Sequence, residues 1–250
     1  MKYSLATISI AALIGYLTFQ SLFGNQTTRW HQRMTIVVDT STGDVSGSSV
    51  TEVANRKTDG VFALMETRGV HSYVTGEAVV VEVQSGRYMF ALLEPVSLDG
   101  SWKRDAAHWV YPAFGLGQET DPMERTFENA MRQLRRQLYD QPVPLPPDGW
   151  PLMVTFDDLS DPATVRKVDP LDLAATFGPG VKLRAVTLEL TNAPITSGKV
   201  VSALGEGFFS KWAALVRGSF ANEKYPLSDP FYRSLVARLT RNDFIVENNQ

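Results

Sequence analysis

The chain has 250 residues and a net charge of −3, and 44% of its residues are hydrophobic, 20% charged and 10% aromatic. This composition excludes a disordered chain, a coiled coil and a multi-pass membrane protein, and the charge balance gives no electrostatic case for nucleic-acid binding. Cysteine is absent, which excludes a disulfide framework, a zinc site with cysteine ligands and a thiol nucleophile.

The first predicted element is an apolar segment close to the N-terminus. No charged residue occurs between Lys2 and Arg29, and residues 3–24 are mostly apolar. About 20 apolar residues in a helix span a bilayer core of roughly 30 Å. The sequence therefore predicts one N-terminal hydrophobic helix within residues 1–28, which acts either as a membrane anchor or as a signal segment.

An uncleaved anchor is favoured over a cleaved secretion signal. A cleavage site has small residues at positions −3 and −1, whereas residues 22–24 would place Leu22 at −3. We expect a single-pass protein of the bacterial inner membrane with its body in the periplasm, since a short N-terminal tail translocates the chain that follows it. Secretion to the periplasm after signal cleavage is the first alternative, and a buried helix of a cytosolic protein is the second.

Residues 29–250 are predicted to form a single α+β body that begins with an antiparallel sheet. The pattern of β-branched and apolar residues predicts strands at residues 34–39, 45–53, 61–65, 70–74, 77–83 and 87–93. The first two strands form a hairpin, in which Gly47 indicates a bulge or the close approach of another backbone. The last two form a second hairpin. We expect residues 34–94 to belong to one antiparallel sheet.

The region that follows, residues 99–117, is irregular and rich in aromatic residues. One interpretation is a loop or short strand that covers one end of the sheet. The other is a surface that binds a ligand or another envelope protein, because aromatic side chains dominate the energetics of interfaces. The residues of this predicted surface are Trp102, His108, Trp109, Tyr111 and Phe114.

The C-terminal half is predicted to mix helices and strands. A helix over residues 121–139 begins with an Asp-Pro cap and has one apolar face, and its arginines lie off that face. These arginines could contact phosphate or anionic lipid, but neighbouring acidic residues favour a solvated face. Residues 141–150 contain four prolines and form a weak boundary within the body. The remaining predictions are strands at residues 152–156 and 181–191 and helices at 162–168, 170–177, 204–220 and 229–240.

Carboxylates are densest just after the strand predicted at residues 152–156. Paired carboxylates bind hard cations or act as acid and base, but Asp161 and Asp169 each precede a proline and are better explained as helix caps. The whole cluster consists of Asp157, Asp158, Asp161, Asp169 and Asp172. No histidine belongs to a motif with metal-ligand spacing; the three are His31, His71 and His108. We therefore predict no metal site and no cofactor.

Three stretches of the body carry a likeness to known sequences. They are residues 30–53, which begin WHQRMTIVVD, residues 76–93, which begin GEAVVVEV, and residues 151–196, which begin PLMVTFDDL. Together they resemble an uncharacterised family of N-terminally membrane-anchored hypothetical proteins of Gram-negative bacteria. The family has no assigned activity, so the resemblance implies an envelope protein and supplies no catalytic residue.

These features favour a membrane-anchored bacterial envelope protein of unknown activity. We expect a non-enzymatic binding or assembly role that faces the periplasm, with residues 3–24 in the membrane and another envelope protein as partner. The alternative is an envelope hydrolase that uses the carboxylates of residues 157–172 or a histidine. Such an enzyme requires those side chains to converge in one pocket.

Overall fold

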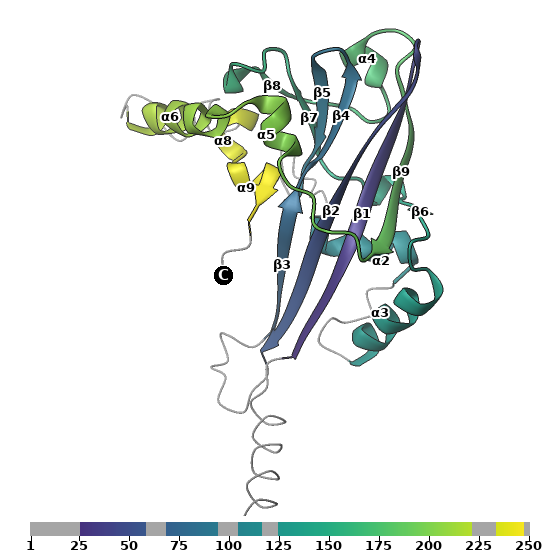
Figure 1. Ribbon diagram of the computed structural model, residues 1–250. Helices are drawn as coiled ribbons and strands as arrows, with labels where there is room; N and C mark the ends of the chain where they lie inside the picture. The colour runs from purple at the N-terminus through teal and green to yellow at the C-terminus, as the bar shows by residue number, and fades with distance from the viewer. Residues whose placement is uncertain (1–25, 59–68, 95–104, 117–124, 222–233, 248–250) are drawn as a thin grey trace, which may run out of the picture.

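The computed structural model describes residues 26–58, 69–94, 105–116, 125–221 and 234–247 (Figure 1). The strands of these residues form two sheets with antiparallel pairing, and helices are concentrated in the C-terminal half. The predicted α+β class with a sheet-rich N-terminal half is therefore confirmed. The segment predicted to cross the membrane, residues 3–24, lies outside the described residues. Within the described part of the chain, no helix is long and apolar enough to span a bilayer.

The larger sheet has six strands in the order β10-β3-β2-β1-β9-β6. Its centre is a long hairpin, paired from Gln26 with Lys57 to Thr40 with Gly43. The predicted hairpin is thus present but longer at both ends, because buried polar side chains such as Gln32 and Asn55 interrupt the apolar pattern. The strands are β1 (Gln26–Thr40), β2 (Gly43–Thr58), β3 (Gly69–Glu77), β6 (Val143–Pro144), β9 (Lys182–Thr191) and β10 (Ile245–Val246).

The smaller sheet has four strands in the order β4-β5-β7-β8. They are β4 (Val79–Gln84), β5 (Arg87–Ala91), β7 (Met153–Phe156) and β8 (Val165–Lys167). The prediction of one sheet over residues 34–94 is wrong, since β3 ends at Glu77 and the chain continues after Ala78 as β4 of this second sheet. The predicted strand at residues 61–65 lies outside the described residues.

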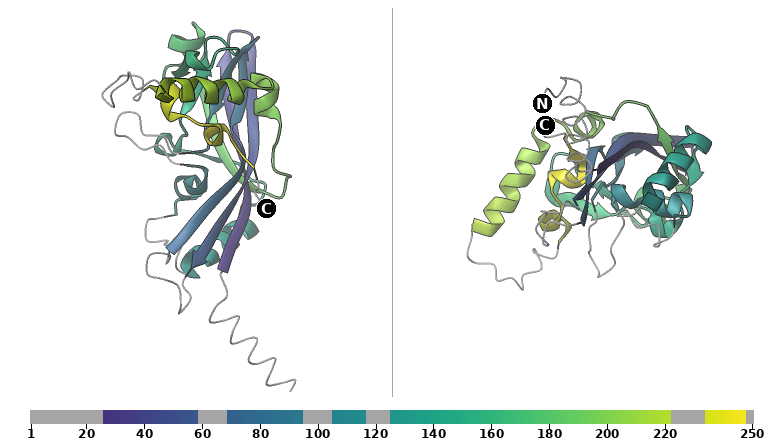
Figure 2. Two further views of the ribbon diagram at one scale, coloured as in Figure 1. Left: turned by 90° about the vertical axis from the view of Figure 1, so that its left-hand side faces the viewer. Right: turned by 90° about the horizontal axis from the view of Figure 1, so that it is seen from below.

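The smaller sheet lies between the larger sheet and a layer of helices. Side chains alternate between its two faces, so that Met89 and Ala91 join the core shared with the larger sheet, whereas Phe90 and Phe156 join the core under the helices. The helices of this outer layer are α5 (Lys199–Leu204), α6 (Phe208–Ala221), α8 (Leu235–Arg238) and α9 (Arg241–Phe244). Figure 2 shows α6 on one side of the strands and the helices of residues 106–137 on the other.

The remaining short helices pack on the core that the two sheets share. They are η2 (Ala106–His108), α2 (Val110–Phe114), α3 (Arg125–Gln137), η3 (Pro147–Gly149) and α4 (Leu173–Phe177), whereas η4 (Pro162–Thr164) lies against α6 of the outer layer. Three of these helices, α2, α3 and α4, bury the side chains of Val110, Met131 and Phe177 in that core. The proline-rich residues 141–150 take part in the fold through β6, which pairs with β9, and through Leu145, which is buried.

Several predicted helices differ from the observed ones for local reasons. Residues 162–168 form one turn of 3-10 helix followed by β8, because Val165 and its neighbours pair with β7. The helix predicted at 204–220 is divided, since Gly205 and Gly207 both have a φ near +80° that a continuous helix cannot contain. The helix predicted at 229–240 is described only from residue 234, where α8 and α9 are each four residues long.

The passage from β3 to β4 is a corner at which one strand leaves the larger sheet and enters the smaller one. Glu77 is buried there, and its carboxylate accepts hydrogen bonds from the backbone N–H groups of Lys199 (2.8 Å) and Val200 (3.2 Å) in α5. The Ser49 hydroxyl of β2 donates to the Glu77 carbonyl over 2.6 Å. The corner therefore joins both sheets and the first turn of a helix.

At this corner β2 passes against the backbone of β4. A Cβ atom on Gly47 would overlap the Val80 carbonyl oxygen and lie 2.8 Å from its carbonyl carbon, which real Cβ atoms essentially never do. Gly47 faces inward, because its cross-strand partner Ile36 is fully buried. The close approach predicted from this glycine is confirmed.

We predict that Gly47→Ala lowers the free energy of unfolding by about 1–3 kcal/mol, because the new methyl group forces β2 and β4 apart. Urea denaturation of both proteins measures the change. The matched control is Gly218→Ala in α6, where a Cβ meets no atom within 4 Å and alanine has the better helix propensity. Equal stability of Gly47→Ala and the parent chain would contradict the close approach.

Candidate functional site

The predicted aromatic surface is divided between the core and the exterior. Trp109 is only 1% exposed and belongs to the core between the sheets, so its assignment to a partner surface is corrected. Tyr111 and Phe114 are half-buried and pack against that core, whereas His108 is exposed. The fifth residue, Trp102, lies outside the described residues. The region was predicted to be a loop or a short strand, but its described residues form the helices η2 and α2, which bury Ala106, Ala107 and Val110.

His108 and Asp105 form a local pair at the surface. The Asp105 carboxylate caps η2 by accepting the His108 backbone N–H, and it lies 2.5 Å from His108 Nδ1. The His108 ring also stacks on Tyr111, with ring centroids 5.8 Å apart. Both contacts hold the imidazole in one orientation, which is sufficient to explain its position as part of a helix start.

Two further carboxyl groups lie close to this pair. Leu93 is joined to both segments, since its N–H donates to the Asp243 carbonyl (2.8 Å) and its carbonyl accepts from Ala106 N–H (2.8 Å). Burial raises the pKa of Glu94 above its ordinary value, and the negative charges of Asp105 and Asp243 raise it further. Burial also raises the pKa of Asp243, although hydrogen bonds from Thr240 oppose that effect. Carboxylates are therefore crowded on this side of the core.

We predict that Glu94→Gln stabilises the protein at neutral pH and that the gain disappears in acid. A carboxyl whose pKa is higher in the folded state than in the unfolded state makes folding less favourable as pH rises through the interval between the two pKa values. Above that interval the charged Glu94 opposes folding, whereas below it both states are protonated and glutamine brings no advantage. Thermal unfolding at several pH values measures this, with the exposed Glu206→Gln as control; a pH-independent difference would contradict the prediction.

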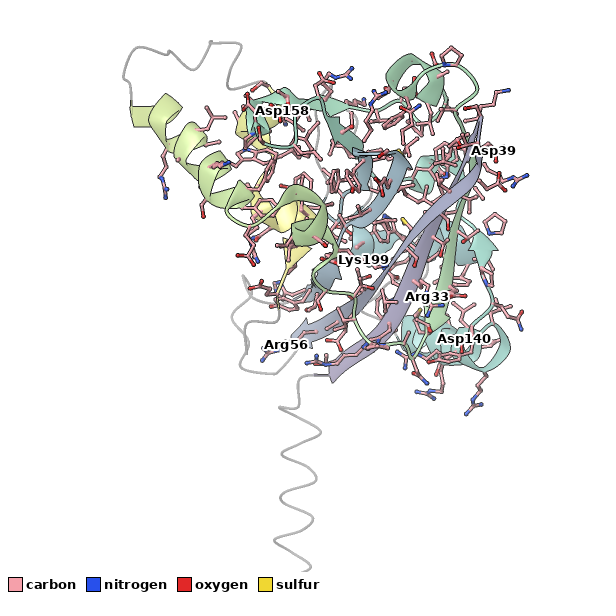
Figure 3. The ribbon with its side chains drawn as sticks, turned by 45° about the horizontal axis from the view of Figure 1, so that its top comes forward. Arg33, Asp39, Arg56, Asp140, Asp158 and Lys199 are labelled. Carbon is pink, nitrogen blue, oxygen red and sulfur yellow. The ribbon has the colours of Figure 1, made fainter. Side chains whose placement is uncertain are left out.

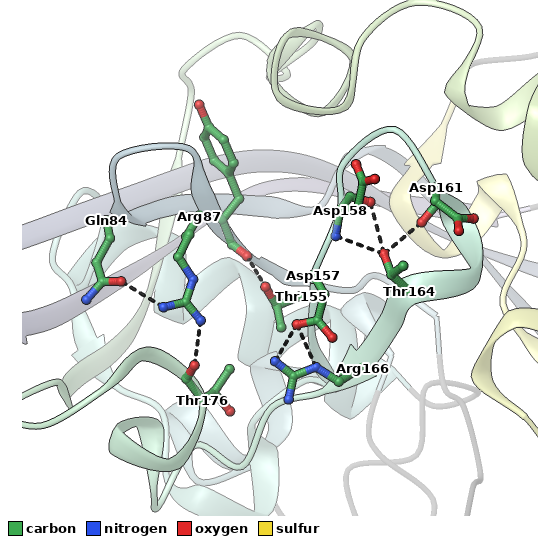
Figure 4. A network of polar contacts seen from close by, with 10 residues as sticks. Gln84, Arg87, Thr155, Asp157, Asp158, Asp161, Thr164, Arg166 and Thr176 are labelled. Carbon is green, nitrogen blue, oxygen red and sulfur yellow. Dashed lines mark hydrogen bonds and ion pairs between the residues drawn. The ribbon is translucent and has the colours of Figure 1, made fainter.

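The carboxylates of residues 157–172 are engaged in local structure (Figure 4). Asp157 pairs with Arg166 through Nε (2.9 Å) and Nη2 (2.6 Å). Asp161 accepts from Ala163 N–H, which confirms its predicted role as the cap of η4, whereas α4 begins only at Leu173 and is capped by Asp172, which accepts from Ala175 N–H, and not by the predicted Asp169. Asp169 accepts from Leu171 N–H. Hydrogen bonds from Ser160 lower the pKa of Asp158, which is consistent with a carboxylate that stays charged.

These carboxylates do not converge with a histidine. In the described part of the chain, Asp157 and Asp158 are hydrogen-bonded to their own loop, and His108 is bonded to Asp105 on a different element. The described residues also contain no group of three acidic or histidine side chains that could hold a metal ion. His71 lies exposed on β3, opposite Arg56 of β2.

The third histidine, His31, borders a pocket of about 250 Å³ at the end of the larger sheet where β1 begins and β9 ends. We call it the end pocket. Because β9 pairs with β1 only as far as His31 and Thr191, the first residues of β1 extend past β9, and the end of α3 lies beside them. The residues that line the end pocket are Arg29, Trp30, His31, Glu52, Arg135, Tyr139, Leu190, Thr191 and Asn192.

The sheet side of the end pocket is a set of paired charges. Glu52 accepts from Arg29 over 3.0 Å and lies 3.4 Å from His31 Nε2, while His31 Nδ1 is 2.8 Å from the Ala193 carbonyl oxygen. One step along the same face, Arg33 pairs with Glu189. The two arginines of β1 are thus already neutralised by carboxylates of β2 and β9.

The helix side of the end pocket carries groups whose hydrogen-bonding capacity is not used. Arg135 has no carboxylate partner among the described residues, and partial burial lowers the pKa of its guanidinium. The Tyr139 hydroxyl is buried without a hydrogen-bond partner in the same part of the chain. Burial raises the pKa of the Tyr139 phenol, and the charge of Asp140 adds to this effect.

A backbone connection fixes Tyr139 beside β9. The N–H of Asp140 donates to the Leu190 carbonyl over 2.8 Å, and Tyr139 forms a parallel bridge with Leu190. Asp140 adopts a left-handed conformation with φ of 54°, which turns the chain sharply after α3. Figure 3 shows Asp140 and Arg33 at the same end of the molecule, far from Asp158 and Asp39.

The end pocket was not predicted as a site, although the arginines of the 121–139 helix were considered as contacts for phosphate or anionic lipid. Its lining comes from four separate elements, and no local spacing connects Arg29, Glu52 and Arg135. In comparisons with known proteins, no protein family, no curated protein and no solved structure matches the chain. The candidate site therefore depends on its own geometry.

We predict that Tyr139→Phe raises the free energy of unfolding by about 1–2 kcal/mol, because it removes a buried hydroxyl that has no partner. Urea denaturation in the absence of added ligand measures the change. Tyr73→Phe is the matched control, since the Tyr73 ring is 54% exposed and its hydroxyl can bond to water. A loss of stability in Tyr139→Phe would show that the hydroxyl has a partner within the fold.

Proposed function

We propose that the protein is an N-terminally anchored binding protein of the bacterial envelope, with its body in the periplasm and the end pocket as its binding site. The observation that carries the proposal is the place of this pocket. β1 begins at Gln26, directly after the apolar residues 3–24, and the end pocket is built on the first residues of β1. A ligand or partner at that end would be held next to the proposed anchor.

The side chains that line the end pocket support binding rather than catalysis. Its guanidinium donor, Arg135, can hold an acceptor group in place, while its carboxylate, Glu52, is paired with Arg29. The hydrolase considered as an alternative requires carboxylates and a histidine to act together. The carboxylates of residues 157–172 are occupied by capping and by Arg166, so we place the binding role ahead of it.

The proposal predicts a membrane-bound protein of full length whose body is accessible from the periplasm. Fractionation of the full chain in a Gram-negative host, followed by protease treatment of intact spheroplasts, measures both properties. In the matched pair of variants, Leu13→Arg with Ile14→Arg should release the protein from the membrane, because each arginine at a helix centre costs about 2.5–3.5 kcal/mol on insertion. Leu171→Arg places a charge on an exposed leucine of the body and should leave it bound.

Two results would contradict this proposal. A protease-protected body would place it in the cytoplasm. A shortened, soluble periplasmic product would show that the segment is a cleaved signal rather than an anchor, and the body would then be a secreted protein.

A further inference from the structure

β3 is the outermost strand of the larger sheet over most of its length. β10 pairs with it only at Gly76 and Glu77, so in the described part of the chain residues 69–75 have a strand on one side alone, which is β2. Figure 1 shows β10, the yellow arrow, beside one end of β3. Exposure changes at the same boundary, because residues 71–73 are exposed whereas Gly76 and Glu77 are buried. We call the open side of residues 69–75 the β3 edge.

The hydrogen bonds of β2 show which backbone groups of β3 point toward it. Val50 of β2 turns its backbone away from β1, since its N–H donates to the Thr196 hydroxyl (2.8 Å) and its carbonyl accepts from Thr196 N–H (3.0 Å). Backbone groups alternate in direction along a strand, so every second residue of β2 after Val50 points toward β3. The residues of β3 that lie opposite them, and therefore bond to β2, are His71, Tyr73 and Thr75.

The residues between these three turn their N–H and C=O groups to the β3 edge; they are Val70, Ser72 and Val74. The bond from Ala78 N–H to the Phe244 carbonyl (2.7 Å) gives the same alternation from the other end of the strand. Among the described residues, none forms a hydrogen bond with these outward backbone groups. They repeat about every 6.8 Å along the strand, a spacing that the backbone of another extended chain matches.

β3 also lacks the features by which exposed edge strands avoid pairing with other chains. Those features include prolines, lysines and bulges. The sequence GVHSYVTGE contains neither proline nor lysine, and the pairing of β3 with β2 is regular throughout. Tyr73 of this strand is 54% exposed, and tyrosine is enriched at protein interfaces. The β3 edge is therefore suited to pair with another strand.

A pocket of about 700 Å³ lies beside the β3 edge, and we call it the edge pocket. Tyr73, Val74 and Thr75 line it from β3, and Val246 and Glu247 line it from the end of β10. A strand added to β3 after the end of β10 would continue the position of β10 in the sheet, and every second side chain of that strand would enter the edge pocket. The structure therefore provides space for side chains as well as partners for the backbone.

Charged residues at the two ends of the edge pocket favour one direction for the added strand. Glu247 lies at the β10 end, where it pairs with Arg241, and Arg56 lines the pocket from β2, opposite His71 of β3. A strand that runs antiparallel to β3, as β10 does, starts near Glu247 and finishes near Arg56. Complementary charges fix the register and direction of a partner, so a basic residue suits the N-terminal part of this strand and an acidic residue its C-terminal part.

We propose that the β3 edge binds an extended segment of another protein, which adds to the larger sheet as a strand antiparallel to β3. The segment alternates apolar and polar residues and carries an acidic residue near its C-terminal end, toward Arg56 and His71. This surface goes beyond the binding function proposed for the end pocket and does not depend on it. A second copy of the chain fits less well, because antiparallel pairing through β3 would direct the β1 strands of two anchored copies in opposite directions.

The test measures amide hydrogen exchange by NMR in the isotope-labelled, full-length chain, held in micelles of a non-ionic maltoside detergent. Without a partner, the N–H groups of Ser72 and Val74 should exchange at least about tenfold faster than those of Tyr73 and Thr75, which donate to β2. The alternation within one strand is the signature of an edge that is paired on one side.

The probe is the synthetic peptide KVTVTVE, which alternates valine with threonine and ends in an acidic residue. Added at millimolar concentration, it should slow the exchange of Ser72 and Val74 at least about threefold, the factor expected when two thirds of the molecules are occupied. The matched control peptide is KVTPTVE, whose central proline has no N–H for the ladder and should leave the exchange rates unchanged.

Two substitutions at Ser72 make a matched pair of protein variants. Both Ser72→Pro and Ser72→Ala lose the bond from the Ser72 hydroxyl to Asn55 Oδ1 (2.8 Å), but only proline removes the outward N–H. KVTVTVE should slow the exchange of Val74 at least about threefold in Ser72→Ala and less than about 1.5-fold in Ser72→Pro. If Ser72→Pro does not fold, the two peptides on the parent chain decide the matter.

Slow exchange of Ser72 and Val74 without a peptide would overturn the proposal, because the β3 edge would already be covered. Protection that is lost on dilution would identify a second copy of the chain as the cover, and protection at every concentration would identify the chain itself. The proposal is equally overturned if KVTVTVE slows neither amide, or if KVTVTVE and KVTPTVE have the same effect. None of these results depends on the end pocket or on where the protein resides in the cell.

Discussion

The corner at which β3 becomes β4 is the constraint on which the rest of the architecture depends. A strand that belongs to two sheets must turn between them, and the neighbouring strand then passes close to the turned part. Here the neighbour is β2, and the space is sufficient only for a residue without a side chain, Gly47. The buried side chain of Glu77 completes the corner, because its oxygens accept hydrogen bonds from the backbone N–H groups of Lys199 and Val200 in α5.

The layers follow from this turn. Once β4 lies across the larger sheet, β5 and β7 pair beside it and have both faces covered, one by the larger sheet and the other by helices. The helices α5, α6, α8 and α9 occupy the far side of the smaller sheet, and among the described residues α3 lies beside the opposite end of the β1–β2 hairpin (Figure 1). The end pocket is found at that end.

The sequence predicts local elements of this fold better than their assembly. The hairpin turns, the cap residue Asp161 and the close approach at Gly47 are consequences of short-range chemistry, and they are present. The exchange of a strand between sheets has no local signal, because Ala78 looks like any residue of a continuous apolar strand. The end pocket has none either: Arg135 was predicted to lie on the polar side of its helix, but its proximity to Leu190 and Arg29 depends on pairing over long separations.

Gly47 also has a bearing on the far end of its own hairpin. Side chains alternate along a strand, so a slip of one residue between β1 and β2 would present Ser46 or Ser48 to the backbone of β4, and both would collide with it. The pairing of Ile36 with Gly47 is therefore the register that the corner accepts. Arg29 lies seven residues from Ile36, roughly 23 Å along the strand. The same register places Arg29 and His31 beside Glu52. The lack of a Cβ atom at Gly47 therefore determines which charged side chains pair seven residues further along the hairpin.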